Sequence, residues 1–344
     1  MMSSTREPAS DRLPTPWAAD GALAGFEART LTLPPDDEGP VVATLVRRRA
    51  AVPAGRAVLY LHGFNDYFFQ AHLAAAYNAN GYDFYALDLR KYGRSLRPWQ
   101  TPNYCTDLRA YFAELDAAIA IISGEEGHRW LLLNGHSTGG LITALYAHAG
   151  QRRGQIKALF LNSPFFDLNL PWFKRLLAWL YVLLGARFPR LPLREDLAPA
   201  YTESLHRNYH GEWEFNLAWK PVVGFQSYAG WLRAIVAGQR RLQAGLAIAC
   251  PVLVMHAARS LNARRWNEGC MHADVVLNVG HMRRFGPGLG RHVTLIAIEG
   301  GMHDLVLSAA PVRERVFAEL FAWLERIEPR ALTGLPDSGA LGGT

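Results

Sequence analysis

The feature that most constrains the fold of this chain is an alternation of short apolar runs with longer stretches of helical character. Each run has five to eight mainly aliphatic residues between turn residues, which is typical of a strand buried on both faces. Helical stretches between such strands predict parallel βαβ units with right-handed crossovers. We therefore predict strands over 57–61, 82–89, 130–134, 156–161, 251–256 and 292–298, and helices over 71–80, 107–122, 137–149 and 312–327.

Two further strands precede this alternation. Residues 26–33 and 41–48 flank a turn rich in Pro, Asp and Gly, and together they predict a hairpin-like start. The total is eight strands in one mostly parallel sheet flanked by helices, which is an α/β fold.

The domain organisation follows from the point at which the alternation of predicted strands and helices is interrupted. Residues 164–245 are rich in Trp, Tyr, Leu and Pro and contain no buried-strand run, but 172–184 and 228–241 have helical character. We predict an inserted helical cap here. The α/β core is then predicted to consist of two pieces, residues 26–163 and 246–328. Both ends of the chain, residues 1–25 and 329–344, are expected to be flexible.

Composition excludes several other classes of protein. Half of the 344 residues are hydrophobic and 19% are charged, so the chain can bury a large core and is not disordered. The net charge of +6 comes from scattered side chains, all but four of the 36 basic residues being Arg, and no basic cluster follows one element as nucleic-acid binding usually requires. We expect no nucleic-acid partner.

The expected location is the cytoplasm. The three cysteines are odd in number and far apart, which suits a reducing compartment. No secretory signal is visible in the polar first 20 residues. The longest apolar run, 176–184, has about half the length that a bilayer span needs.

The most informative segment is 130–140, where a predicted strand runs through Gly135-His-Ser137-Thr-Gly139 into a predicted helix. A turn this tight leaves no room for side chains at the two glycines, and it lifts the hydroxyl of Ser137 above the sheet edge. At the N-terminus of the next helix, the backbone dipole favours developing negative charge. We predict that Ser137 is a nucleophile.

Three segments together resemble the α/β-hydrolase superfamily. They are Leu59-Tyr-Leu-His-Gly63-Phe64, Leu87-Asp-Leu-Arg-Lys-Tyr-Gly-Arg-Ser95 and the Gly135–Gly139 turn, each after a predicted strand. The resemblance covers roughly 26–327 and is strongest to the monoacylglycerol lipase and lysophospholipase group, with which serine aminopeptidases are also classified. It implies an oxyanion hole made by the backbone N–H groups of Phe64 and Thr138.

A serine nucleophile needs a base and an orienting carboxylate, in the chain order Ser, acid, His. His303 follows the last strand at its carboxyl end, where ligands meet a parallel sheet, whereas His292 begins that strand and lies at the wrong end. His281 and His256 are weaker alternatives. We predict His303 as the base.

Only three carboxylates lie between the seventh strand and His303, namely Glu268, Asp274 and Glu299. Many relatives place the acid in a Gly-x-x-Asp turn directly after the seventh strand, but this chain has Arg259 at that point. Asp274 precedes an apolar run, matches the Asp-x-Val pattern of the family, and is the predicted acid. Glu268 is the alternative, and Glu299 is too close to His303 in sequence.

Other polar residues near these motifs are expected to have structural roles: Asp88, Arg90, His62, His136 and Asp304. The histidines show no metal-ligand spacing and no glycine-rich loop matches a nucleotide-binding pattern, so no metal and no cofactor is predicted.

The predicted function is that of a serine hydrolase that cleaves carboxylic esters of lipid-like or other apolar acyl substrates through an acyl-Ser137 intermediate. A serine aminopeptidase or amidase with the same triad is the alternative, because Glu212 and Glu214 of the cap could receive a peptide amine. A non-catalytic ligand-binding protein of the same fold is a third. The apolar helix over 172–184 is either a buried cap core, the usual case, or a lip that contacts a lipid surface. The oligomeric state stays open.

Overall fold

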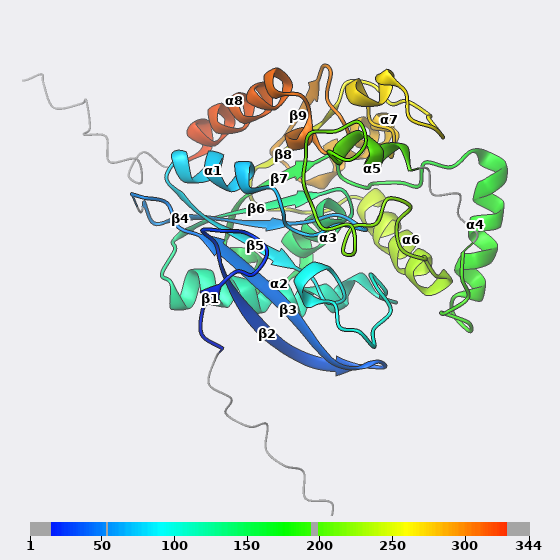
Figure 1. Ribbon diagram of the computed structural model, residues 1–344, viewed down its shortest axis with the longest axis horizontal. Helices are drawn as coiled ribbons and strands as arrows, with labels where there is room; N and C mark the ends of the chain where they lie inside the picture. Colours follow the sequence, from blue (N-terminus) through cyan, green and yellow to red (C-terminus); the bar gives the residue numbers. More distant parts are fainter. Residues whose placement is uncertain (1–14, 53, 194–198, 329–344) are drawn as a thin grey trace, which may run out of the picture.

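The structure is a computed structural model that describes residues 15–52, 54–193 and 199–328. Within these ranges a single sheet of nine strands runs through the molecule in the order β1-β2-β3-β5-β4-β6-β7-β8-β9 (Figure 1). The strands are β1 (Ala18–Ala19), β2 (Glu27–Asp36), β3 (Gly39–Arg48), β4 (Arg56–Leu61), β5 (Tyr82–Asp88), β6 (Trp130–His136), β7 (Ile156–Asn162), β8 (Val252–Ala257) and β9 (Val293–Ile298).

The eight predicted strands are all present, and strands β4 to β9 pair in parallel. The first strands are antiparallel, as the hairpin prediction requires, and β3 also pairs antiparallel with β5. Every residue of β5, β6 and β8 is buried, which explains why these strands are continuous apolar runs rather than alternating ones.

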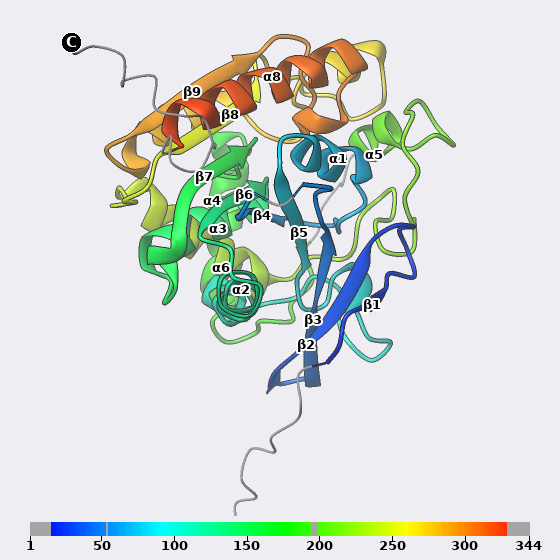
Figure 2. The same ribbon diagram turned by 90° about the vertical axis from the view of Figure 1, so that its left-hand side faces the viewer.

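Helices cover both faces of the sheet. One face packs against α1 (Ala71–Ala79) and α8 (Ala310–Ile327), through buried side chains such as Tyr77 and Trp323. The other packs against α2 (Phe112–Ile119), α3 (Thr138–Ala149) and α6 (Ala229–Gln243), through residues such as Leu141 and Ile235. Figure 2 shows the two groups on opposite sides of the strands. This layering is that of an α/β fold.

The prediction of a flexible segment over 1–25 does not hold for residues 15–25. Strand β1 pairs with β2 and is the ninth strand that the sequence analysis missed. Asp20 accepts hydrogen bonds from Arg94, and the guanidinium of Arg47 lies 3.9 Å from the ring centroid of Trp17. These long-range contacts fix a segment whose polar composition predicts no element. Residues 1–14 and the tail 329–344 lie outside the described residues.

Two helical elements differ from the predictions. The helix predicted over 107–122 starts as expected at Asp107, whose side chain caps the amide of Arg109, but it consists of a 3-10 turn (Leu108–Tyr111), α2 and a π-helical turn (Ala120–Glu125). Helix α7 (Val279–Phe285) was not predicted. It is short, and its four polar or glycine positions hide the helical period.

The segment predicted as a cap, residues 164–245, lies between β7 and β8 and contains α4 (Trp172–Leu184), α5 (Ala200–Leu205) and α6. Helix α6 belongs to the main core, because Leu232, Ile235 and Leu242 are buried against it. Helix α4 is different: it lies at the edge of the molecule beside α6 (Figure 1), and only Ala178 and Val182 are buried. The expectation that α4 forms a buried cap core is therefore wrong.

No helix within the described ranges is both long and apolar enough to cross a bilayer.

Candidate active site

Ser137 stands at the sharp turn between β6 and α3. Its backbone has φ of 53° and ψ of −116°, a conformation that a non-glycine residue rarely adopts. A Cβ atom on Gly135 would collide with Thr143 and Gly139, and one on Gly139 would collide with the carbonyls of Leu61 and His62. The turn therefore needs both glycines, as the sequence analysis predicted.

The structure brings Ser137, His303 and Asp274 together in one hydrogen-bonded chain. His303 Nε2 lies 3.0 Å from Ser137 Oγ, and His303 Nδ1 lies 2.9 Å from Asp274 Oδ2. The exposed fractions of the three residues are 8%, 2% and 0% for Ser137, His303 and Asp274. Because these three side chains are shielded from water, the electrostatic interactions between them are stronger than they would be at the surface.

Asp274 is held by its own backbone surroundings. Its Oδ1 accepts hydrogen bonds from the amides of Val276 and Leu277 at 2.9 and 2.7 Å, which leaves Oδ2 for His303. The two alternative carboxylates, Glu268 and Glu299, are both exposed, whereas the carboxylate that His303 Nδ1 contacts is that of Asp274. The apolar run after Asp274 thus supplies the amides that orient this carboxylate.

The ring of His303 lies between two other rings. The centroids of His136 and Tyr201 are 4.9 and 5.2 Å from that of His303. The two His303 hydrogen bonds and these two ring contacts fix both the position and the tilt of the imidazole. Neither His256 nor His281 approaches Ser137: the former contacts the carbonyl of Ala257, and the latter lies 3.7 Å from Asp167.

Residues 62–67, which follow β4, form what we call the oxyanion loop. Gly63 lies directly against the nucleophile, since a Cβ atom added to it would be 3.1 Å from Ser137 Cβ. The amide of Phe64 donates no hydrogen bond within the described residues. Thr138 is the first residue of α3, so its amide has no partner inside the helix. Of the two predicted donors, Thr138 directly follows Ser137 and Phe64 directly follows Gly63, the glycine that contacts Ser137.

Asp88, the last residue of β5, and Arg90 brace the loops around the site. Asp88 is fully buried and accepts hydrogen bonds from the amide of Phe68 and from Arg94. Arg90 pairs with buried Glu114. Burial raises the pKa of Glu114 to about 7, even though Arg90 favours its charged form.

His62, His136 and Asp304 also hold backbone or loops. His62 Nε2 accepts from the amide of Leu89 at 3.1 Å. Asp304 Oδ1 accepts from the side-chain amide of Asn162 at 2.7 Å. Burial lowers the pKa of His136, with Asp304 acting in the opposite direction. These residues support the site in the way the sequence analysis expects.

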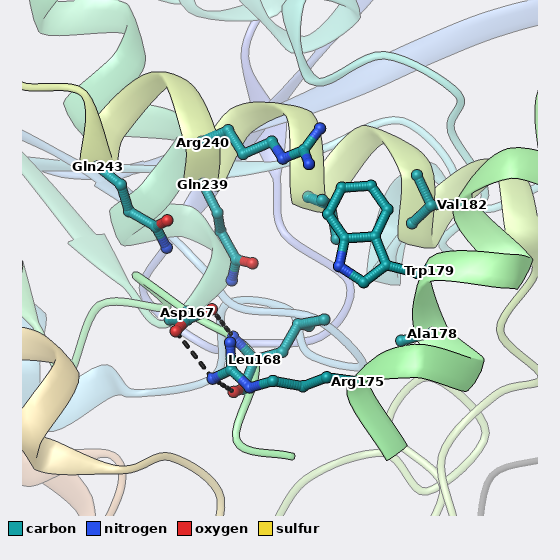
Figure 3. A pocket seen from close by; sticks show the side chains of 10 residues that line it. Asp167, Leu168, Arg175, Ala178, Trp179, Val182, Gln239, Arg240 and Gln243 are labelled. Atoms are coloured by element: carbon teal, nitrogen blue, oxygen red, sulfur yellow. Dashed lines mark hydrogen bonds and ion pairs between the residues drawn. The ribbon is translucent and has the colours of Figure 1, made fainter. Parts of the chain in front are cut away.

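A cavity of about 120 Å³ lies between α4 and α6, and none of the three residues Ser137, His303 and Asp274 lines it (Figure 3). Its polar side chains are already engaged: Arg175 bonds Asp167 at 2.9 Å, Arg240 lies 4.0 Å from the ring centroid of Trp179, and Gln239 donates to the carbonyl of Phe165. In the described part of the chain, no group of three or more His, Cys, Asp or Glu side chains is arranged to hold a metal ion.

Three residues between β7 and β8 that contact the site were not predicted from the sequence. Tyr201 of α5 packs on His303, Trp231 of α6 packs on Phe64 with 4.3 Å between ring centroids, and Lys220 pairs with Asp66 of the oxyanion loop. No local pattern could have identified them, because each contact joins residues more than 100 positions apart in the chain.

Comparisons with known proteins agree with this architecture. A family model described as serine aminopeptidase, S33, matches residues 53–309. Among solved structures, the chain is similar to a soluble variant of monoglyceride lipase from Saccharomyces cerevisiae in complex with a substrate analog, with 18% identity, a TM-score of 0.64, and coverage of 92% of this chain and 99% of that one.

Two other solved structures are similar over most of their length. A monoacylglycerol lipase from Paleococcus ferrophilus has 19% identity and a TM-score of 0.59, with coverage of 83% and 99% of the two chains. A thermostable carboxyl esterase from Bacillus coagulans, in complex with glycerol, has 15% identity and a TM-score of 0.59, with coverage of 87% and 98%. No curated protein matches the chain. The α/β-hydrolase fold predicted from the sequence is confirmed.

Proposed function

The chain belongs to the serine aminopeptidase S33 family of α/β-hydrolases, and on that premise we propose that it is a serine hydrolase of carboxylic esters with lipid-like acyl groups. The observation that carries the proposal is the buried hydrogen-bonded chain from Ser137 through His303 to Asp274. A nucleophile, a base within hydrogen-bond reach of it, and a group that orients the base are what acyl transfer requires.

In the proposed mechanism, His303 Nε2 takes the hydroxyl proton as Ser137 Oγ attacks the carbonyl carbon. The amides of Phe64 and Thr138 stabilise the negative oxygen of the tetrahedral intermediate. The intermediate collapses to acyl-Ser137, and the leaving alkoxide receives the proton from His303. A water molecule, deprotonated by His303, then attacks the acyl carbon; the second tetrahedral intermediate releases the acid as its C–Oγ bond breaks and His303 returns the proton to Ser137 Oγ. Asp274 holds the ring and stabilises its cationic form throughout.

The surroundings of Ser137 favour an apolar acyl group. Phe165 lies next to it, its amide donating to the carbonyl of Ser137 at 3.0 Å, and Phe64 with Trp231 forms an aromatic pair above the oxyanion loop. Apolar and aromatic linings of this kind suit ligands that are themselves mainly apolar.

The aminopeptidase alternative finds less support. An α-amine needs an available carboxylate, but Glu212 pairs with Arg313 at 2.5 Å and Glu214 pairs with Arg207 at 2.7 Å. Both glutamates are mostly exposed and are engaged with arginines rather than aimed at Ser137. An ester therefore suits the site better than a peptide with a free N-terminus.

The test of the activity is a labelling and turnover experiment. The wild-type protein is incubated with a fluorophosphonate probe and with a panel of p-nitrophenyl esters, monoacylglycerols and aminoacyl amides, beside Ser137→Ala. We expect labelling and ester turnover that the variant loses. Full turnover by Ser137→Ala would refute the proposed nucleophile, and the absence of labelling and turnover in the wild type would favour the non-catalytic ligand-binding alternative.

We further propose that the substrate is drawn from a lipid surface that α4 contacts. Trp172, Leu176 and Leu183 have exposed fractions of 84%, 76% and 65% and lie on one side of the helix with Leu180. Helix α4 contains no acidic residue, and the cations Lys174 and Arg187 at its two ends have no carboxylate partner within the described ranges. An exposed apolar face with cations at its margins is the pattern of a helix that lies in the interface of an anionic bilayer.

Vesicle co-sedimentation tests this contact. Wild type is compared with the triple variant Trp172→Ser, Leu176→Ser, Leu183→Ser, on phosphatidylcholine vesicles with and without phosphatidylglycerol. The control replaces Trp99 and Val223, which are exposed elsewhere on the molecule, by Ser. We expect binding that needs the α4 side chains and increases with phosphatidylglycerol. Equal binding by the triple variant would contradict the proposal.

A further inference from the structure

A segment of the cap, residues 216–221, is bonded to the oxyanion loop at three points. Lys220 Nζ donates to Asp66 Oδ1 at 2.9 Å, Asn65 Nδ2 donates to the carbonyl of Pro221 at 3.2 Å, and the amide of Asn216 donates to the hydroxyl of Tyr67 at 2.7 Å. Three consecutive residues of the oxyanion loop are thus tied to a chain segment that lies about 150 positions away in sequence.

The Lys220–Asp66 ion pair is buried. The exposed fractions of the two side chains are 3% and 4%, so water cannot replace either partner. The ammonium group of Lys220 is surrounded by the rings of Phe69, Tyr201 and Phe215, whose centroids lie between 5.6 and 6.0 Å from Nζ. A buried charge is costly unless it is paired, so each partner fixes where the other must be.

The same cap segment also contacts the residue between Phe64 and Asp66. Asn65 has φ of 52°, in the left-handed region that Asn adopts more readily than most non-glycine residues. Lys220 Nζ also lies 3.5 Å from the carbonyl oxygen of Asn65, and the side chain of Asn65 is held by Pro221. The cap therefore contacts both the backbone and the side chain of the residue that follows Phe64.

We infer that Lys220 is a positioning residue, which through Asp66 and Asn65 holds the oxyanion loop in the conformation that presents the Phe64 amide to the substrate. The inference rests on the proposed function, because it concerns the donor that stabilises the tetrahedral intermediate. Displacement of a catalytic group by about 1 Å can cost about 10²-fold in rate, so a buried pair two residues from the donor is placed to control the rate.

A second path leads from Lys220 to the base. The ammonium group lies 5.6 Å from the ring centroid of Tyr201, and Tyr201 packs edge-on against His303. The same cap lysine therefore touches the surroundings of the oxyanion loop and of the imidazole. Loss of Lys220 is expected to disturb the loop more, because its contact with the loop is an ion pair and its contact with Tyr201 is not.

The test compares Lys220→Met with Lys91→Met. Lys91 is a matched control: it is 1% exposed, pairs with Asp36 and Glu38 at 2.6 Å each, and lies 5.5 Å from the ring centroid of Tyr104. Its carboxylate partners belong to the turn between β2 and β3 rather than to the oxyanion loop. Both variants lose one buried lysine, so both should lose thermal stability, but only Lys220→Met should affect the chemical step.

The measurements are kcat and KM for a p-nitrophenyl ester and the inhibition constant of a trifluoromethyl ketone, whose hemiketal oxyanion mimics the tetrahedral intermediate. For folded Lys220→Met we expect kcat to fall about 10²-fold with little change in KM, and the ketone to bind more weakly by the same factor as kcat/KM falls. A purely structural role of Lys220 would lower stability without changing kcat/KM or the affinity for the ketone.

A double variant, Asp66→Asn with Lys220→Met, leaves no unpaired buried charge and covers the case in which Lys220→Met does not fold. It should show the same loss of kcat and of ketone affinity. The inference is overturned if either folded variant keeps kcat within about threefold of wild type, or if Lys91→Met loses as much. Absence of turnover by the wild-type protein would instead refute the proposed function, so the two failures are distinguishable.

Discussion

Replacement of Asp274 by Asn isolates the electrostatic part of the proposed triad. Asn has nearly the same shape, and its oxygen can still accept from the amides of Val276 and Leu277, as Asp274 Oδ1 does. The amide nitrogen then faces His303 Nδ1, which is 2.9 Å from Oδ2 in the wild-type chain. Because an amide nitrogen donates, Nδ1 must become an acceptor and Nε2 must carry the proton.

The consequence is the wrong tautomer for a base. An Nε2 that carries a proton cannot take one from Ser137 Oγ, although the 3.0 Å separation is unchanged. Both side chains are shielded from water, so no solvent molecule restores the polarity. The same exchange in a Ser-His-Asp site costs about 10⁴-fold in kcat, which corresponds to about 5.5 kcal/mol of transition-state stabilisation.

The assay measures kcat for a p-nitrophenyl ester and the free energy of unfolding in urea. We expect a fall of about 10⁴-fold in kcat with a loss of only about 1–2 kcal/mol in stability, because two hydrogen bonds to a charged acceptor become bonds to a neutral one. Glu268→Gln is the control for the alternative acid, and it should keep full activity. A loss of less than about tenfold in Asp274→Asn would refute the role of Asp274.

Three other perturbations give contrasting outcomes. Gly63→Ala places a methyl group 3.1 Å from Ser137 Cβ, so kcat should fall by at least about tenfold while stability changes by about 1–3 kcal/mol; unchanged ester turnover would contradict this close approach. Arg94→Met leaves buried Asp20 and Asp88 unpaired, and urea unfolding should show a loss of about 3–5 kcal/mol, with a loss below about 1 kcal/mol counting against it. Burial disfavours the charged form of Glu38, but hydrogen bonds from Lys91, Thr101 and Arg190 outweigh it and lower its pKa to about 2. Glu38 therefore stabilises the fold above about pH 4.5 and loses this contribution as the pH falls towards about 2, so the stability difference between wild type and Glu38→Gln should shrink over that range; a difference independent of pH would exclude this linkage.

The sheet and the position of Ser137 were predictable because their determinants are local. A strand buried on both faces needs a contiguous apolar run, and the turn at Ser137 needs glycines at fixed offsets, as the collisions at Gly135 and Gly139 show. The rule that active groups gather at the carboxyl ends of parallel strands then selects His303 over His292. Among the three carboxylates, the resemblance to the Asp-x-Val pattern of the family favoured Asp274, which is the one that lies against the ring.

What the sequence could not predict depends on contacts between distant segments. The pairing of Lys220 with Asp66 joins residues 154 positions apart, and neither has a neighbouring motif that marks it. The exposure of α4 could not be predicted for a different reason. An apolar helix with the same period can be buried under other elements or left exposed, as at a lipid surface. The arrangement of α4 beside α6, with only Ala178 and Val182 buried, shows that the helix is exposed, which its sequence alone does not.

The cap contacts both the surface where we propose that lipid binds and the loop where we propose that the oxyanion is stabilised. Its outer helix α4 carries the apolar face that we assign to a lipid surface, and α4 packs on α6 around the cavity of Figure 3. Helix α6 in turn contacts Phe64 through Trp231, and the segment just before it holds Asp66 through Lys220. Any displacement of α6 or of the segment before it would therefore also act on the loop that contains Phe64, so the lipid contact proposed for α4 and the oxyanion donor proposed at Phe64 depend on the same part of the chain.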